Sequence, residues 1–410
     1  MLARFSIFVV AFSLIQQIQT AGVCQDWIVT NDPDLVIEPI IRDIPFATSL
    51  TFSPDGRLFV LAKNSGNVRT LDLETRSLST PVIKIKPVVA GIEAGAIGLA
   101  FDPDYDPIHG GKVYVSHVVS SATWRISSFD EDGNGKGSNL RAVLDFPDCL
   151  PVDGFFDQSV HNIENIHFGP NPVSSTPEQV LYVSFGDGGI LPGGVDRENN
   201  PALTPDNWCG GIYFFDPANP PEIADATPHN FCLGVRNAYD FAFHPQSGAL
   251  YFTENGFNDY DEVNQALYGD HFGWDESRGP NDNPAFVDPI FTQALPTIAP
   301  TGLCIYSGFR LPERYQRHIL FGSYNQGEIY LLTLEDPSNP RSSVVSVEKI
   351  LESETGASRP LGITGGIVDL TEGPDGWIYM ATGGNPLGTG SIYRIRTPNE
   401  EEGFAGIWVY

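Results

Sequence analysis

Basic residues are scarce in this chain. Over 410 residues, 23 lysines and arginines face 51 aspartates and glutamates, which gives a formal net charge of −28. Proteins that bind a nucleic-acid backbone do so mainly with lysine and arginine, so we expect no nucleic-acid partner. An acidic surface suits solubility, divalent cations or a salty medium, and solubility alone is the simplest interpretation of the overall charge.

Hydrophobic runs long enough to span a membrane are absent. The apolar stretch Phe5–Ile15 is shorter than the roughly 20 residues that a spanning helix needs. It follows Arg4 and precedes the small residues 20–22, which is the order of a secretory signal peptide. We therefore expect residues 1–22 to be a leader and residues 23–410 to be one mature domain, secreted to an extracellular or periplasmic space and without a membrane span.

Cysteine is also scarce. No CxxC pair or Cys/His cluster is present, so we expect no zinc or iron–sulfur site. The odd number leaves one thiol free or bonded to another chain, and the pairing stays open. An oxidising compartment is consistent with the five cysteines, which are Cys24, Cys149, Cys209, Cys232 and Cys304.

A strand–turn–strand pattern recurs six times. Each unit has an apolar strand, a turn rich in Pro, Asp and Gly, and a second strand that ends in aromatic or β-branched residues. Blades of this kind bury their faces by packing around an axis. We predict an all-β fold, a six-bladed β-propeller, because a pair of β-sandwiches would not explain a sixfold recurrence. The units start at Ser49, Gly98, Asn165, Asp240, Gly302 and Ile367.

Polar clusters that could bind a ligand flank one of these hairpins, within Phe231–Trp274. The clusters are Arg236-Asn237 and Glu254–Asn264. Loops on a rigid scaffold are where binding residues gather. We therefore expect the hairpin to supply the scaffold and these loops to supply the chemistry.

A histidine and an aspartate stand at the two ends of the third unit. His161 opens it and Asp187 follows its second strand. On one face of a propeller the two could meet, and the carboxylate would then orient the imidazole and raise its basicity. From the pattern alone, a surface histidine beside an Asp-Gly turn is the simpler interpretation.

One acidic segment resembles the start of a calcium loop. Asp130, Asp132 and Asn134 place oxygen donors at alternate positions before a glycine. Arg141 stands where an EF-hand has its bidentate glutamate, so this is not an EF-hand. A turn between two blade strands fits the segment equally well.

Eight segments occur in this order along the chain: GIEAGAIGLAFDPDY, VYVSHV, HNIENIHFGP, LYVSFGDGG, FCLGVRNAYDFAFHP, ENGFNDYDEVN, HFGW and EGPDGWIYMATGG. Together they resemble the soluble quinoprotein glucose/sorbosone dehydrogenase family over nearly the whole mature chain. The block GVRN…DEVN…FGW is the most specific part. The resemblance implies a propeller that holds pyrroloquinoline quinone (PQQ) and calcium in a polar pocket at one end of its axis.

The resemblance also assigns the proton chemistry. It implies that His161 takes the proton from a sugar's anomeric hydroxyl while hydride passes to the quinone, and that Asp187 is the partner of this histidine. Electrons would then pass to an external acceptor. Arg236 matches the residue whose fixed positive charge stabilises the reduced cofactor.

Further cofactor and metal contacts follow from the same resemblance. Asn237 and Asn162 match residues beside the cofactor. The backbone carbonyls around Gly256 and Phe257 match the calcium-binding turn, where the metal polarises a quinone carbonyl.

Some family positions differ in this chain. Where the family has HNGG, the chain has His161 to Glu164, which adds bulk and a carboxylate. Gly366, Val368 and Asn325 stand where two arginines and a lysine would bind the cofactor's carboxylates. Each such charge-assisted contact contributes about 1.5 to 3 kcal/mol, so their loss weakens the expectation of PQQ binding.

Three functions follow from these residues. The first is an exported PQQ-dependent aldose dehydrogenase. The alternative is a secreted non-catalytic propeller that binds carbohydrate or protein with calcium. The third, a lactonase or other metal hydrolase that uses Asp187, Glu164, Asn237 and Asn255, ranks last because the order of the segments follows the dehydrogenases.

Overall fold

The computed structural model describes residues 28–147, 149, 160–176, 178–193, 200–224, 227–281, 283–352, 360, 362–363, 365–384 and 388–398. The predicted leader, residues 1–22, lies outside them. Within the described part of the chain, no helix has the length and apolar character to cross a membrane.

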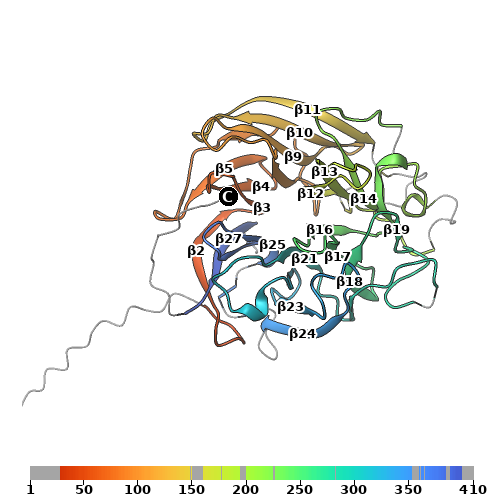
Figure 1. Ribbon diagram of the computed structural model, residues 1–410. Helices are drawn as coiled ribbons and strands as arrows, with labels where there is room; N and C mark the ends of the chain where they lie inside the picture. The colour runs from red at the N-terminus through yellow and green to blue at the C-terminus, as the bar shows by residue number, and fades with distance from the viewer. Residues whose placement is uncertain are drawn as a thin grey trace, which may run out of the picture.

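Six sheets surround a central axis (Figure 1). The innermost strand of each is an end strand, and each innermost strand packs against the next one around a closed ring. These strands are β3 (Ala47–Phe52), β8 (Ala96–Phe101), β12 (Ile163–Pro170), β16 (Ala238–Phe243), β21 (Pro300–Ile305) and β25 (Gly366–Glu372). They coincide with the first strands of the six predicted units, and the predicted six-bladed β-propeller is confirmed.

The other strands complete the blades outward from the axis. Blade 1 adds β4 (Leu58–Ala62), β5 (Asn67–Asp72), β6 (Ser77–Leu78) and β7 (Ile83–Lys84), and blade 2 adds β9 (Gly111–Ser120), β10 (Thr123–Glu131) and β11 (Gly137–Pro147). Blade 3 adds β13 (Gln179–Phe185), β14 (Gly211–Phe215), β15 (Asn230–Leu233) and β19 (Asp270–His271), and blade 4 adds β17 (Leu250–Glu254), β18 (Tyr260–Ala266) and β20 (Phe291–Ala294). Blade 5 adds β22 (Ile319–Ser323), β23 (Ile329–Leu334) and β24 (Val344–Leu351), and blade 6 adds β26 (Ile378–Gly383), β27 (Thr389–Arg396), β2 (Val36–Pro45) and β1 (Ile28–Val29). Three short 3-10 helices are η2 (Pro201–Leu203), η3 (Thr227–His229) and η4 (Glu313–Tyr315).

The ring is closed by strands from opposite ends of the chain. In blade 6, β2 pairs antiparallel with β27, so that Val36 lies opposite Arg396. The buried carboxylate of Glu38 on β2 accepts hydrogen bonds from Arg394 at 2.7 Å and from Arg396 at 2.9 Å. An ion pair between the two strands therefore reinforces the closure.

All six innermost strands share one irregularity. Each has a register shift where it pairs with the second strand of its blade. Bulges of this kind redirect side chains. In two blades an aspartate at the shift accepts a backbone N–H from the next blade: Leu303 donates to Asp240, and Leu50 donates to Asp369. At these two junctions a carboxylate therefore links the innermost strands of neighbouring blades.

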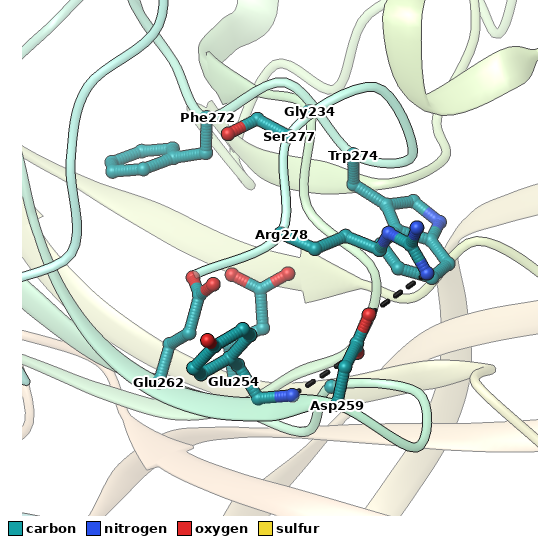
Figure 2. Close-up of a pocket in the computed structure, with 10 residues that line it drawn as sticks. Gly234, Glu254, Asp259, Glu262, Phe272, Trp274, Ser277 and Arg278 are labelled. Carbon is teal, nitrogen blue, oxygen red and sulfur yellow. Dashed lines mark hydrogen bonds and ion pairs between the residues drawn. The ribbon is translucent and has the colours of Figure 1, made fainter. Parts of the chain in front are cut away.

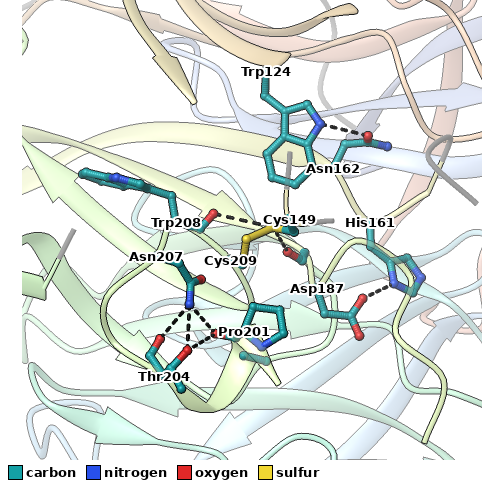
Figure 3. Close-up of a disulfide and its surroundings, with 12 residues drawn as sticks. Trp124, Cys149, His161, Asn162, Asp187, Pro201, Thr204, Asn207, Trp208 and Cys209 are labelled. Carbon is teal, nitrogen blue, oxygen red and sulfur yellow. Dashed lines mark hydrogen bonds and ion pairs between the residues drawn. A yellow bond between two sulfur atoms is a disulfide. The ribbon is translucent and has the colours of Figure 1, made fainter. Parts of the chain in front are cut away.

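The cysteines are divided between one disulfide and two thiols. Cys149 and Cys209 form a disulfide across 60 residues of sequence (Figure 3). Cys232 and Cys304 are buried free thiols, while Cys24 lies outside the described residues. The sequence predicted one unpaired thiol, whereas the structure has at least two.

Candidate functional site

The structure brings His161 and Asp187 together, as Figure 3 shows. The imidazole Nδ1 lies 2.6 Å from the Asp187 carboxylate, and both side chains are buried. His161 precedes β12 in a left-handed conformation with φ of 50°, and Asp187 follows β13. Gly186 makes this approach possible, because a Cβ there would lie 2.5 Å from the Cβ of His161. The pair is therefore built where two neighbouring strands of blade 3 end.

The Asp187 carboxylate is held by two further donors. Its second oxygen accepts the indole N–H of Trp274 at 2.7 Å, and its first oxygen accepts the backbone N–H of Gly189 at 2.8 Å. An ionised carboxylate only accepts hydrogen bonds, so Nδ1 of His161 carries the proton in this pair. Nε2 is then left as the nitrogen that can accept a proton from a ligand.

Arg236 adjoins the pair, because its backbone carbonyl accepts the N–H of Asp187 at 2.8 Å. Its guanidinium donates to the backbone carbonyls of Asn255 and Gly256 at 2.7 and 2.8 Å. The same group faces the rings of Phe257 and Trp274, 5.7 and 5.5 Å from their centroids. A fixed cation thus occupies the turn that the sequence assigned to calcium.

The predicted metal residues fall into two separate regions. The carbonyl of Gly256 accepts from Arg236. Asp130, Asp132 and Asn134 lie where β10 turns into β11, in the outer half of blade 2, and the Asp132 carboxylate accepts the backbone N–H of Asn134 at 2.9 Å. No group of three or more His, Cys, Asp or Glu side chains that could hold a metal ion is found among the described residues. The calcium assignments stay predictions.

A cluster of titratable side chains lies beside His161. Glu164 of this cluster was singled out from the sequence, but Lys63 and Glu93 were not. Lys63 and Glu164 are 5 % and 1 % exposed. Burial, together with the nearby charge of Glu93, raises the pKa of Glu164 well above its ordinary value, and Lys63 opposes this shift. Burial lowers the pKa of Lys63, although Glu164 and Glu93 oppose that change. Burial therefore favours the neutral form of Glu164, although the charge of Lys63 lies nearby.

An acidic pocket adjoins Trp274 (Figure 2). Glu254 and Glu262 line it, and the Asn264 amide donates to both of them at 2.8 and 3.0 Å. Burial raises the pKa of both glutamates; for Glu254 the charge of Glu262 adds to the shift. Glu254 also accepts the backbone N–H of Arg236 at 2.7 Å, which connects this pocket to the His161–Asp187 side of the site.

Several buried polar atoms of the predicted site have no hydrogen-bond partner. Seven such side-chain atoms occur in the described part of the chain, and four of them belong to the two motifs singled out above. These four are Asn162 Nδ2, Glu164 Oε2, Arg236 Nε and Asn237 Oδ1. Because buried polar groups are nearly always paired, this concentration indicates a site built for a polar ligand.

Cations are missing at the three positions where the family binds the cofactor's carboxylates. A Cβ at Gly366 would lie 2.5 Å from the ring of Tyr324, so this ring already fills the space. Val368 is buried, and the Asn325 amide donates to the Thr297 carbonyl at 3.1 Å. None of these three positions therefore supplies a cation.

Comparison with known proteins places the chain among sugar oxidoreductases. An uncharacterized protein of Synechocystis sp. is 24% identical over 395 residues, covering 90% of this chain and 88% of the relative. The aldose sugar dehydrogenase YliI of Escherichia coli is 23% identical over 363 residues, covering 83% and 87%. The PQQ-bound aldose sugar dehydrogenase of Streptomyces coelicolor shares the fold, with a TM-score of 0.66 at 19% identity over 89% of this chain and 99% of that one. The family model for glucose/sorbosone dehydrogenases matches residues 43–394, and the chain belongs to this family.

Proposed function

We propose that this protein is an aldose dehydrogenase that oxidises the anomeric carbon of a sugar. The observation that carries the proposal is the buried His161–Asp187 pair, set among unpartnered polar atoms of Asn162, Arg236 and Asn237. Relatives named as aldose sugar dehydrogenases support the substrate class.

In this proposal the chain's own residues handle the proton. Oxidation of an anomeric C–H to a lactone removes a hydride from carbon and a proton from the hydroxyl. Nε2 of His161 accepts the proton, and Asp187 stabilises the imidazolium that forms. Trp274 and Gly189 hold Asp187 in place, so the imidazole is oriented before the sugar arrives.

The residues fit PQQ at one end only. Arg236 and Asn237 would face the quinone oxygens. The Gly256 carbonyl accepts from the Arg236 guanidinium in this structure, so Gly256 and Phe257 would hold calcium only once Arg236 turns toward the cofactor. When bound, PQQ would supply the hydride acceptor for this oxidation. Gly366 and Val368 offer no cation to the cofactor's carboxylates, so we expect weak binding.

The remaining expectations belong to the same proposal. We infer that residues 23–410 form one exported domain, released from its leader to a periplasmic or extracellular space. There it would meet a small sugar and an external electron acceptor.

Titration of calcium-loaded protein with PQQ tests the proposal. Cofactor absorbance and the melting temperature are followed together, and dye reduction is then measured over a panel of aldoses. Saturable binding with sugar-dependent dye reduction is the expected result. A spectroscopically confirmed holoprotein that reduces no dye with any aldose would refute it.

The missing cations favour one other function, a propeller that binds carbohydrate or protein with calcium. That function predicts calcium-dependent binding that survives His161→Ala. Failure to bind micromolar PQQ, together with such calcium-dependent binding of a glycan, would support this second function over the first.

A further inference from the structure

The backbone of His161 is held by a residue outside its own blade. Its N–H donates to the Glu93 carboxylate at 2.7 Å. Glu93 lies in the connection between β7 of blade 1 and β8 of blade 2, whereas His161 opens blade 3. Non-glycine residues rarely adopt a left-handed conformation such as that of His161, so an anchor at this amide bears directly on where the imidazole points.

Hydrogen bonds from Lys63 hold the connection that carries Glu93 in place. Lys63 is buried at the end of β4, and its ammonium donates to the carbonyls of Gly91 and Ile92 at 2.7 and 3.0 Å. The backbone N–H of Ala96 donates a hydrogen bond to the Lys63 carbonyl at 3.0 Å. Gly95 makes the close passage possible, because a Cβ there would lie 2.6 Å from the Lys63 side chain. The segment therefore bends tightly over Lys63 and presents Glu93 to His161.

We propose that Glu93 is a positioning residue for His161, and that Lys63 holds the segment that carries Glu93. Glu93 fixes the main chain of His161, while Asp187 fixes its ring. Two carboxylates from different elements thus fix the position of one imidazole. Glu93 sets where the Cβ of His161 lies, and Asp187 sets how its ring is turned. The catalytic part of this inference rests on the proposed role of His161, but the structural part does not.

The charges around Glu93 suit this role. The charges of both Glu93 and Glu164 act on the pKa of Lys63, and a single buried cation cannot neutralise two carboxylates. Burial raises the pKa of Glu164, which lies deeper than Glu93 and has an oxygen without a partner, so the neutral form of Glu164 is favoured. The proposal rests on the 2.7 Å contact between the Glu93 carboxylate and the His161 amide.

Amide hydrogen exchange at His161 tests the anchor without cofactor or sugar. Residue-resolved exchange is measured for the whole protein, the variants Glu93→Ala and Glu93→Gln, and the surface control Glu178→Ala, together with their melting temperatures. We expect exchange at His161 to be on the order of tenfold faster in Glu93→Ala, the size expected for the loss of one hydrogen bond. Glu93→Gln, which keeps an acceptor oxygen, and Glu178→Ala should resemble the wild type.

Each outcome decides the inference. Unchanged exchange at His161 in Glu93→Ala, at an unchanged melting temperature, would overturn it. If Glu93→Ala fails to fold, Glu93→Gln decides: protected exchange supports the anchor, and exchange at the unprotected rate overturns it. Lys63→Met should loosen residues 91–93 and His161 together, and loosening of residues 91–93 alone would remove Lys63 from the proposal.

Kinetics then test the catalytic part separately. In protein that reduces dye, Glu93→Ala should lower kcat on the order of tenfold with little change in KM, and Glu93→Gln should restore it. A wild type without dye reduction would count against the proposed function while leaving the exchange result intact. Normal kcat in Glu93→Ala, with fast exchange at His161, would show that the anchor has no part in catalysis.

Discussion

At the scale of single residues, the site depends on which groups carry protons. Asp187 accepts three N–H donors and keeps the proton of His161 on Nδ1. Elsewhere on the axis, Asp369 shows the opposite behaviour, because burial and the charge of Asp240 raise its pKa to about 7. Asp187 thus orients the imidazole of His161, whereas Asp369 makes the free energy of unfolding depend on pH.

Replacing Asp187 with asparagine should cost activity without loss of the fold. The amide can keep one contact with the imidazole, but it lacks the charge that stabilises the imidazolium. We expect kcat to fall about 100-fold or more, as for loss of a positioned general base, with a smaller change in KM. Steady-state dye reduction and circular dichroism check this. A variant that keeps wild-type kcat would contradict the assigned role of the pair.

Asp369 predicts a pH effect on stability. The folded state holds this proton up to about pH 7, whereas the unfolded chain releases it near the ordinary value of 3.8. Between these values the folded state binds more protons, so the free energy of unfolding decreases as the pH rises. Asp369→Asn, which can still accept the N–H of Leu50, should remove this contribution. Melting temperatures from pH 5 to 8 should fall more steeply for the wild type, and parallel curves would show that Asp369 does not titrate there.

At the scale of elements, two neighbouring strand ends and a disulfide shape the site. β12 starts just after His161, and β13 ends just before Asp187. The Cys149–Cys209 disulfide packs against this corner, since a Cβ at Gly188 would lie 3.0 Å from the Cβ of Cys149. The bridge therefore supports the turn that carries Asp187.

Removing this disulfide should destabilise both the protein and the turn. Cys149→Ser with Cys209→Ser opens a loop of 60 residues, and we expect the free energy of unfolding to fall by about 2 to 4 kcal/mol. Denaturant titration measures this. Hydrogen exchange at residues 187–189 should also accelerate more than exchange in blade 5. A uniform increase over both regions would mean that the bridge acts only on global stability.

The strands show how far the sequence alone can be interpreted. The six innermost strands were predictable because each combines an apolar run with a Pro/Gly turn, and both signals are local. The pairing of β2 with β27 was missed, since it joins residues more than three hundred positions apart and β2 carries prolines and charges. The contact of Glu93 with His161 was missed because it joins two loops 68 positions apart and no local pattern marks it. The pairing of His161 with Asp187 came from family resemblance, because the pattern alone favoured a surface histidine.

At the scale of the whole molecule, the propeller is a ring whose last blade is assembled from both ends of the described chain. Every blade interface depends on that closure, because a ring with one open junction exposes two blade faces. Glu38 is the polar centre of the junction: Arg394, Arg396 and Arg76 all donate to its carboxylate.

Glu38→Ala should therefore weaken the entire ring. It leaves Arg394 and Arg396, which are largely buried, without their shared partner, and breaking such a pair costs about 2 to 3 kcal/mol after allowance for partial exposure. Chemical denaturation should give this loss in one cooperative transition, since no blade can keep its packing once the junction opens. As a control, Glu348→Ala removes an exposed ion pair with Arg314 in blade 5 and should change stability by less than about 1 kcal/mol. If Glu38→Ala unfolded in two steps, with blade 6 melting first, the blades would be separable units and the ring closure would not control the stability of the whole.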